Sequence, residues 1–396
     1  VEGLIECGIN VNEIGLCPTP LLYFSCYELT ASGGIIVTGS HNPKNHNGFK
    51  IVLKNSPFFG KDLLRISEIA KNFCIKKENG SVNYFDLQKK YISRLIKNLN
   101  QKKKINIVWD SGNGAAGNIM KDLAEKIDGN AEILFSEIDG NFPNHHPDPS
   151  EPKNLEICKK KLLELNYDIC FAFDGDGDRL GVIDDKGRII SGDKLLLLLS
   201  KEMLKTKKCK IIADVKCSQV LFNEVERLGG QVFMSPTGHS HVKNFLKKIK
   251  ADLAGEMSGH IFFANDYFGF DDAFYAAVKV IEIINNNEKR LSDLVDEIPE
   301  VFNTPEIRID CDDQKKFQII ADVKENLRKK NKNFIDIDGV RVSDKDGWWL
   351  LRASNTQPAL VMRCESLSCE GLEFQKESLK KELLQIKCDF DEKIFY

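Results

Sequence analysis

The sequence has no long apolar run and no excess of one charge. The run from Leu195 to Leu199, between Lys194 and Lys201, is among its longest apolar runs, whereas a membrane-spanning helix needs about 20 apolar residues. Lysine and arginine total 56 and aspartate and glutamate 59, which gives a net charge of −3 and no basic footprint for a nucleic acid. We therefore expect neither a membrane nor a nucleic acid as partner, and we expect the leucine run to lie in a core helix.

The sequence also lacks paired cysteines. Its 12 cysteines are scattered, with no Cys-x-x-Cys pair and no histidines at zinc-site spacing beside them. The first residues do not form a basic segment followed by an apolar one, so no export signal is indicated. We expect reduced, mostly buried thiols in a cytoplasmic protein.

Apolar runs alternate with amphipathic stretches of helical period, which is the pattern of βαβ units. One series has expected strands and helices, in chain order, at 105–109, 115–127, 131–135, 155–165 and 168–173. A second series begins with a helix and has expected elements at 194–205, 211–213, 218–228, 231–234, 240–249 and 251–254. The two series have similar length and order, so we predict related α/β domains.

After about residue 300 the expected strands become closely spaced, at 305–309, 334–336, 348–352 and 359–363, with a long helix near 313–330 and a last helix behind them. This is typical of an α+β domain with an antiparallel sheet. The predicted domains are three related α/β units at 1–88, 89–188 and 189–299 and an α+β unit at 300–396. The pattern of expected elements in the first unit begins as if in the middle of a domain, so we expect that an N-terminal segment is missing.

The loop FAFDGDGDRLG, residues 171–181, carries three carboxylates that alternate with glycines: Asp174, Asp176 and Asp178. Their hard oxygen atoms suit Mg²⁺. A calcium loop of the EF-hand type shares the opening but needs glycine and glutamate where this chain has Arg179 and Asp185. The guanidinium of Arg179 can donate two parallel hydrogen bonds to a phosphate beside the cation site. Phosphoryl transfer is therefore the leading chemistry.

Three further polar loops follow apolar runs, and ligands in α/β sheets bind beyond the carboxyl ends of strands. The run GIIV, which we expect to be a buried strand, ends in TGSHNP, residues 38–43. In AGEMSGH, residues 254–260, Glu256 and Ser258 could project to one side of an extended segment and accept a vicinal diol. In LRASNTQP, residues 351–358, a cluster of donors suits a phosphate. The alternatives are polar turns, with Ser354 capping a helix.

The segment GNGAAG, Gly112 to Gly117, matches a dinucleotide-binding fingerprint after an expected strand, with Glu132 further on. A dinucleotide fold is therefore an alternative. The triple-aspartate loop, however, has no role in hydride transfer.

Taken together, TGSHNP, DGDGDR, GEMSGH and RASNTQP, in this order, resemble the α-D-phosphohexomutase family, specifically its bacterial phosphomannomutase/phosphoglucomutase branch. The resemblance spans nearly the whole chain and implies three mixed-sheet domains around a central cleft. WDSGNGAAG resembles a turn of the family's second domain where no dinucleotide binds. The triplet Glu256-Met257-Ser258 resembles that of the mannose/glucose branch, because glucosamine-type mutases more often have glutamine at the position of Met257.

The resemblance implies that Ser40 is carried as a phosphoserine whose phosphate completes the coordination of one Mg²⁺ at the three aspartates. The 1-phosphate and 6-phosphate of mannose or glucose would then be interconverted through a hexose 1,6-bisphosphate, which also serves as activator. The implied catalytic residues are Ser40, Lys50, Arg179 and His260, with Lys50 and His260 as candidates for proton transfer. The implied substrate-binding residues are His41, Asn42, Lys216, His239, Glu256, Ser258, Arg352, Ser354, Asn355 and Thr356.

Other functions stay open at this point. A phosphatase would transfer the phosphoryl group to water, a non-catalytic relative would only bind sugar phosphates, and a phosphoglucosamine mutase would act on an amino sugar. We expect a monomer or a weak homo-oligomer. The family normally has a further N-terminal segment with an arginine and a tyrosine that line the cleft.

Overall fold

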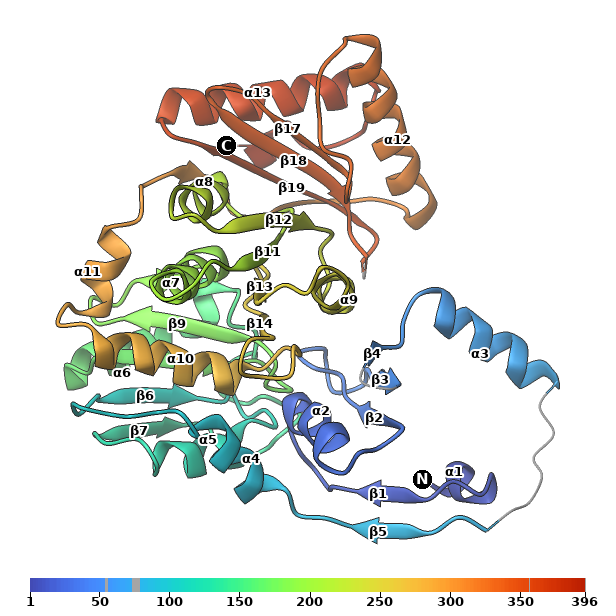
Figure 1. Cartoon of the computed structure of the whole chain (residues 1–396). Helices are drawn as coiled ribbons and strands as arrows, with labels where there is room; N and C mark the ends of the chain where they lie inside the picture. The colour runs from blue at the N-terminus through green and yellow to red at the C-terminus, as the bar shows by residue number, and fades with distance from the viewer. Residues whose placement is uncertain (54–55, 73–78, 356, 396) are drawn as a thin grey trace.

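The computed structural model describes residues 1–53, 56–72, 79–355 and 357–395. The chain folds into four consecutive units, which follow one another from blue to red in Figure 1. Within the described residues, no helix combines the length and the apolar character needed to cross a bilayer. The cysteines that the structure describes are all free thiols.

The second unit is built on a five-stranded mixed sheet in the order β10-β9-β8-β6-β7. Strand β6 pairs in parallel with β7 and β8, and β9 and β10 extend the sheet in antiparallel pairing. Both faces of β8 are covered, so its whole apolar run is buried. The elements are α4 (Gln88–Leu95), β6 (Ile107–Asp110), α5 (Gly117–Ala124), β7 (Ala131–Leu134), the 3₁₀ turn η1 (Pro152–Leu155), α6 (Glu156–Leu165), β8 (Ile169–Phe173), β9 (Leu180–Asp184) and β10 (Ile189–Ile190).

The third unit repeats this arrangement with the order β12-β11-β13-β14. Strand β11 pairs in parallel with β12 and β13, and β14 is antiparallel to β13. The pairing directions are those of β7-β6-β8-β9, so the prediction of related mixed-sheet units is confirmed for the second and third units. The elements are α7 (Gly192–Leu204), β11 (Lys210–Asp214), α8 (Gln219–Arg227), β12 (Gln231–Ser235), α9 (His239–Ile249), β13 (Leu253–Gly255), β14 (Ile261–Phe263), α10 (Ala273–Asn286) and α11 (Leu291–Asp296).

The first unit has two small sheets, β1 paired in parallel with β5 and the antiparallel β2-β3-β4. The expectation that the run GIIV is a buried strand is wrong, because Ile35 is 48% exposed and Val37 57%. Helix α2 covers one face of β2, where Gly34 meets Leu22 and Cys26 and Ile36 packs against the core, whereas Ile35 and Val37 lie on the other face. The elements are α1 (Glu2–Glu6), β1 (Val11–Glu13), α2 (Thr19–Glu28), β2 (Gly33–Val37), β3 (Phe49–Leu53), β4 (Ser56–Pro57), α3 (Lys61–Asn72) and β5 (Val82–Tyr84).

The fourth unit is an antiparallel sheet backed by two long helices, as predicted. The strand expected at 334–336 is reduced to a single bridge between Ile335 and Arg341. The elements are β15 (Phe302–Asn303), β16 (Ile307–Asp310), α12 (Asp313–Lys329), β17 (Val340–Ser343), β18 (Gly347–Ala353), β19 (Ala359–Ser366), α13 (Cys369–Gln385) and the 3₁₀ turn η2 (Glu392–Phe395).

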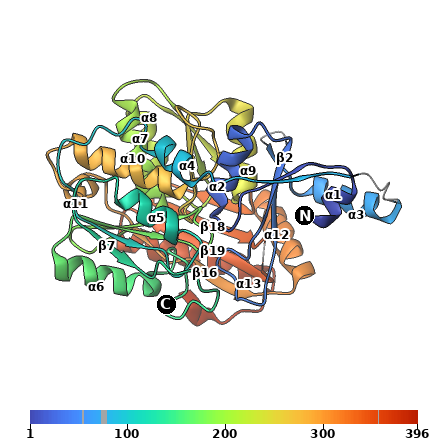
Figure 2. The same cartoon turned by 90° about the horizontal axis from the view of Figure 1, so that it is seen from below.

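A shared apolar core joins the first three units. Helix α10 contacts β9 and α4 of the second unit as well as α7 and β14 of the third, and Figures 1 and 2 both place it beside α7. The run from Leu195 to Leu199 is buried in α7, as expected for a core helix. The sheets are therefore held in a fixed relation, which positions the loops at their strand ends.

Arg341 joins the fourth unit to the third. Its guanidinium is buried, donates to the carbonyl oxygens of Val215 at 2.7 Å and Cys217 at 2.9 Å, and lies 3.8 Å from the ring centre of Trp348. A buried charge held by carbonyls and an aromatic face is costly to truncate, because the acceptors then lose their donor.

We predict that Arg341→Ala lowers the free energy of unfolding of the fourth unit by about 3 kcal/mol. Urea unfolding followed by tryptophan fluorescence checks this, since Trp348 and Trp349 both lie in β18. The control Arg328→Ala removes an exposed guanidinium and should change stability by less than about 0.5 kcal/mol. Equal effects of the two variants would contradict the role given to Arg341.

Candidate active site

The loop after β2 brings Ser40 against the aspartate loop that follows β8. Ser40 has a left-handed backbone conformation with φ of 50°, and its Oγ donates to Oδ2 of Asp174 at 3.0 Å. A Cβ at position 175 would lie 2.1 Å from the carbonyl oxygen of Ser40, so this approach requires Gly175. The two loops are 134 residues apart in the chain and share one site.

The three aspartates of the loop form a compact buried cluster, with one oxygen of each within 4.8 Å of the others. The backbone N–H groups of Asp178 and Arg179 donate to Oδ1 of Asp174 and fix its orientation. Burial and the neighbouring Asp178 raise the pKa of Asp174 to about 7. Oδ1 of Asp176 is buried without a hydrogen-bond partner among the described residues. Crowded carboxylates and an unpartnered oxygen fit a hard divalent cation.

Two basic side chains flank the aspartates. Nζ of Lys50 lies 2.5 Å from Oδ2 of both Asp176 and Asp178. Burial alone would lower the pKa of Lys50, but these carboxylates outweigh it and raise that pKa well above its ordinary value. Arg179 donates from Nε to Asp174 at 3.0 Å and from Nη2 to His41. Lys50 and Arg179 thus place positive charge at the aspartate cluster that Ser40 contacts.

The loop after β13 is tied directly to the aspartate loop. Arg179 and His260 form a backbone bridge, and the N–H of Leu180 donates to the carbonyl oxygen of Gly259 at 3.1 Å. Nε2 of His260 lies 3.3 Å from Oδ1 of Asp178. Burial opposes a charge on His260, but Asp178 and Glu256 outweigh it and raise the pKa of the imidazole to about 10. His260 is therefore a third cation at the cluster.

Glu256 and Ser258 lie in a turn, so the expectation of an extended segment is wrong. Both instead meet Nδ1 of His260, Glu256 through Oε2 at 3.1 Å and Ser258 through Oγ at 3.0 Å. Oε1 of Glu256 accepts from the N–H of Gly238 at 2.5 Å. The turn gathers a carboxylate, a hydroxyl and an imidazole at one point.

His239, at the start of α9, stacks on the ring of His260 with their centres 5.6 Å apart. Its Nδ1 lies 3.0 Å from Oδ2 of Asp271, whose other oxygen accepts from Lys243 at 2.9 Å. Burial and Lys243 lower the pKa of His239. Asp271, held by Lys243, thus fixes the orientation of the His239 ring.

The fourth unit contributes Arg352, whose Nε donates to Oδ2 of Asp338 at 2.9 Å. Its Nη2 is buried without a hydrogen-bond partner among the described residues. Asp338 also accepts from the N–H of Thr237, which precedes Gly238 and so links this loop to Glu256. Asn355 donates to the carbonyl oxygen of Thr237 at 3.4 Å. These contacts bring the last predicted loop to the other three.

Ser354 does not cap a helix, because its Oγ accepts from the N–H of Gln357 in the turn before β19. Lys216 reaches Glu306 at 3.2 Å, and Asn42 is exposed in the Ser40 loop. Thr356 lies outside the described residues.

The glycine-rich segment that suggested a dinucleotide site supports the aspartate loop instead. Ala115 donates its N–H to the carbonyl oxygen of Gly175 at 2.8 Å, and a Cβ on Gly114 would lie 2.7 Å from that oxygen. Gly114 therefore allows the two loops to pack closely. The space in front of the glycine is occupied by the aspartate loop and not by a dinucleotide.

Several residues at the site were not singled out in the sequence. Asp148 lies 3.2 Å from Nη1 of Arg179 and 3.8 Å from His41, and Thr19 donates to Asp176 at 2.6 Å. Asp148 follows two histidines and a proline, and Thr19 lies between two prolines at the start of α2. Their polar character beside prolines was visible, but their partners lie far away in the chain.

Comparison with known proteins supports the same assignment. Family profiles described as "Phosphoglucomutase/phosphomannomutase, alpha/beta/alpha domain" I, II and III match residues 1–74, 89–187 and 191–302, and the profile of the C-terminal domain matches 306–381. A phosphomannomutase/phosphoglucomutase of Pseudomonas putida is 40% identical over 388 residues, covering 98% of this chain and 84% of the relative. A phosphoglucomutase of Neisseria gonorrhoeae is 38% identical over 370 residues, covering 92% of this chain and 80% of the relative.

The fold agrees with that of a solved relative. The crystal structure of a phosphoglucomutase/phosphomannomutase family protein from Burkholderia thailandensis matches with a TM-score of 0.91 and 35% identity, covering 98% of this chain and 86% of that one. The resemblance read from the four loops is confirmed. The chain therefore belongs to the α-D-phosphohexomutase family, in its phosphoglucomutase/phosphomannomutase group.

Proposed function

We propose that this enzyme interconverts the 1-phosphate and 6-phosphate of mannose and of glucose, with Ser40 carrying the transferred phosphoryl group as a phosphoserine. The observation that carries the proposal is the contact between Oγ of Ser40 and Oδ2 of Asp174 at 3.0 Å, with Arg179 on the same carboxylate. Relatives whose names include both mutase activities support both sugars.

Asp174, Asp176 and Asp178, together with the Ser40 phosphate, would hold one Mg²⁺. When bound there, the ion would neutralise charge on the phosphoryl group as it moves. Asp174 orients both the Ser40 hydroxyl and Arg179. We therefore propose that Arg179 donates charge-assisted hydrogen bonds to the phosphoryl oxygens.

In the proposed first half-reaction, the bond from phosphorus to the Ser40 oxygen breaks and a bond to a free sugar hydroxyl forms. The hydroxyl proton must pass to a base at the site, and we propose Lys50 and His260 as the candidates for this proton transfer. Because the neighbouring carboxylates keep both groups protonated, either group would have to lose its own proton before it accepts that of the sugar. The bisphosphate then reorients in the site, and the second half-reaction returns the other phosphoryl group to Ser40. A trace of free hexose 1,6-bisphosphate phosphorylates any enzyme that has lost its phosphate.

Substrate recognition is proposed for the loops of the third and fourth units. Glu256 and Ser258 meet at His260 and would bind the hydroxyls common to both orientations of the sugar. The unpartnered Nη2 of Arg352 would bind the phosphate that is not reacting. The remaining proposed contacts come from His41, Asn42, Lys216, His239, Ser354, Asn355 and Thr356.

The test supplies the purified protein with mannose 1-phosphate or glucose 1-phosphate, Mg²⁺ and a trace of glucose 1,6-bisphosphate. Formation of the 6-phosphate without release of inorganic phosphate supports the proposal. Inorganic phosphate equal to the substrate consumed would instead identify a phosphatase. Faster turnover of glucosamine phosphates than of both hexose phosphates would identify a phosphoglucosamine mutase.

A further inference from the structure

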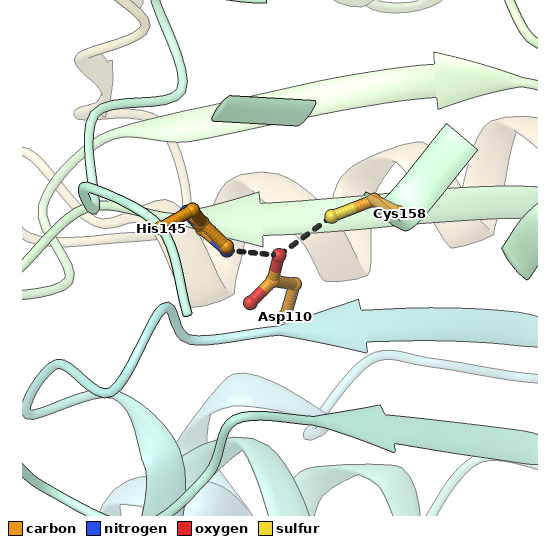
Figure 3. A group of neighbouring side chains, drawn as sticks. All are labelled: Asp110, His145 and Cys158. Atoms are coloured by element: carbon orange, nitrogen blue, oxygen red, sulfur yellow. Dashed lines mark hydrogen bonds and ion pairs between the residues drawn. The ribbon is translucent and has the colours of Figure 1, made fainter. Parts of the chain in front are cut away.

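A second cluster of potential metal ligands lies in the second unit, apart from the aspartate loop. Figure 3 shows the carboxylate of Asp110 between the side chains of His145 and Cys158. Oδ2 of Asp110 lies 2.8 Å from Nε2 of His145 and 2.5 Å from Sγ of Cys158. One atom from each side chain lies within 4.8 Å of the others. Asp110 ends β6, His145 lies in the loop before η1, and Cys158 belongs to α6.

The imidazole of His145 is oriented as in many metal sites. Its Nδ1 lies 3.0 Å from the carbonyl oxygen of His146, an acceptor that requires the proton to be on Nδ1. Nε2 faces Oδ2 of Asp110, to which a doubly protonated ring donates, and the same nitrogen presents a lone pair to an ion once that proton is lost. Metal-binding histidines usually donate their second ring N–H to a carbonyl or carboxylate in this way.

The surroundings hold the other donors in place. Oδ1 of Asp110 accepts from the N–H of Gly112 at 2.7 Å, which leaves Oδ2 for the cluster. A Cβ on Gly112 would lie 3.0 Å from Cε1 of His145, so the glycine leaves room for the ring. Asp110 and Cys158 are fully buried, and the His145 side chain is 10% exposed. An ion would therefore enter along the histidine.

We propose that Asp110, His145 and Cys158 bind a divalent ion of the zinc class, at a site distinct from the aspartate loop. Imidazole nitrogen, thiolate sulfur and carboxylate oxygen are the ligands that Zn²⁺ prefers, and three protein ligands leave the fourth position to water. A tetrahedral ion holds such donors about 3.3–3.8 Å apart, so Oδ2 of Asp110 must withdraw by about 1 Å when the ion enters. Uptake releases the thiol proton of Cys158, and the Nε2 proton of a doubly protonated His145, to solvent.

Occupation of this site would couple to the reaction. The loop that carries His145 also carries Asp148, which holds Arg179 and His41. An ion that fixes His145 to β6 and α6 would fix Asp148 with it.

The experiment uses the whole protein with excess Mg²⁺, which occupies the all-oxygen site, and then titrates Co²⁺ as a spectroscopic substitute for Zn²⁺. We expect the charge-transfer absorption of a cobalt–thiolate bond to grow to one equivalent per chain, and added Zn²⁺ to abolish it. Cys158→Ser should remove this absorption and weaken Zn²⁺ binding at least about 10-fold. The matched control Cys209→Ser alters another buried cysteine and should leave both unchanged.

Absence of thiolate absorption in the wild-type protein, or its persistence in Cys158→Ser, would overturn the proposal. His145→Gln provides a second variant at a less buried position, and it should weaken Co²⁺ binding at least about 10-fold. An unchanged affinity in that variant would also count against the site. These readouts do not depend on mutase activity, so they remain decisive if the proposed function fails.

Discussion

Ser40→Ala should abolish mutase turnover, with kcat lowered at least about 1,000-fold. The variant has no oxygen to carry the phosphoryl group, and the other groups of the site cannot replace it. Intact-mass measurement should show the wild-type protein heavier by one phosphate after incubation with glucose 1,6-bisphosphate, and the variant unchanged. Coupled assays of mannose 6-phosphate and glucose 6-phosphate formation measure the loss of turnover.

A matched control for this variant is Ser93→Ala, which removes an exposed hydroxyl on α4 that donates to the carbonyl oxygen of Lys89. It should keep the phosphate increment and full activity. Phosphate retained by Ser40→Ala on another residue, together with normal turnover, would refute Ser40 as the phosphoryl carrier.

Asp176→Asn should lower kcat at least about 100-fold and raise the Mg²⁺ concentration needed for half-maximal activity. The substitution keeps the size of the side chain but removes one negative charge from the buried cluster. It also replaces an anionic ligand by a neutral one, at a carboxylate whose Oδ1 has no other partner among the described residues. A Mg²⁺ titration of activity, with binding followed by calorimetry, measures both effects.

The matched control lies at the opposite end of the same strand. Asp168 precedes β8 and accepts from the N–H of Asn106 at 2.7 Å, so Asp168→Asn leaves the cation site intact. It should alter stability slightly and leave the Mg²⁺ dependence unchanged. If Asp176→Asn kept the wild-type Mg²⁺ requirement, the ion would have to bind elsewhere.

Local patterns in the sequence predicted the sheets because apolar runs and helical periods are short-range signals. The three aspartates could be identified for the same reason, since they alternate within one loop. The exposure of Ile35 and Val37 could not, because an apolar run does not reveal whether one face of a strand or both are covered.

Contacts between distant segments were beyond the sequence patterns. Asp338 and Asp271 act through Arg352 and His239, and nothing near either aspartate in the chain indicates its partner. Helix α10 is buried on nearly every side. It therefore has no polar face, and its sequence lacks the amphipathic repeat by which a helix is predicted. Asp110 and Cys158 are 48 residues apart, which hides their common site from any spacing rule.

The matching strand orders of the second and third units have an evolutionary consequence. The aspartate loop joins β8 to β9, and the Glu256 loop joins β13 to β14, so the two occupy equivalent places in the repeated topology. Duplication of one ancestral unit would produce this correspondence. In the function that we propose, the two copies of this hairpin differ in role, because one would hold the cation and the other would bind sugar hydroxyls. The backbone bridge between Arg179 and His260 joins the two loops.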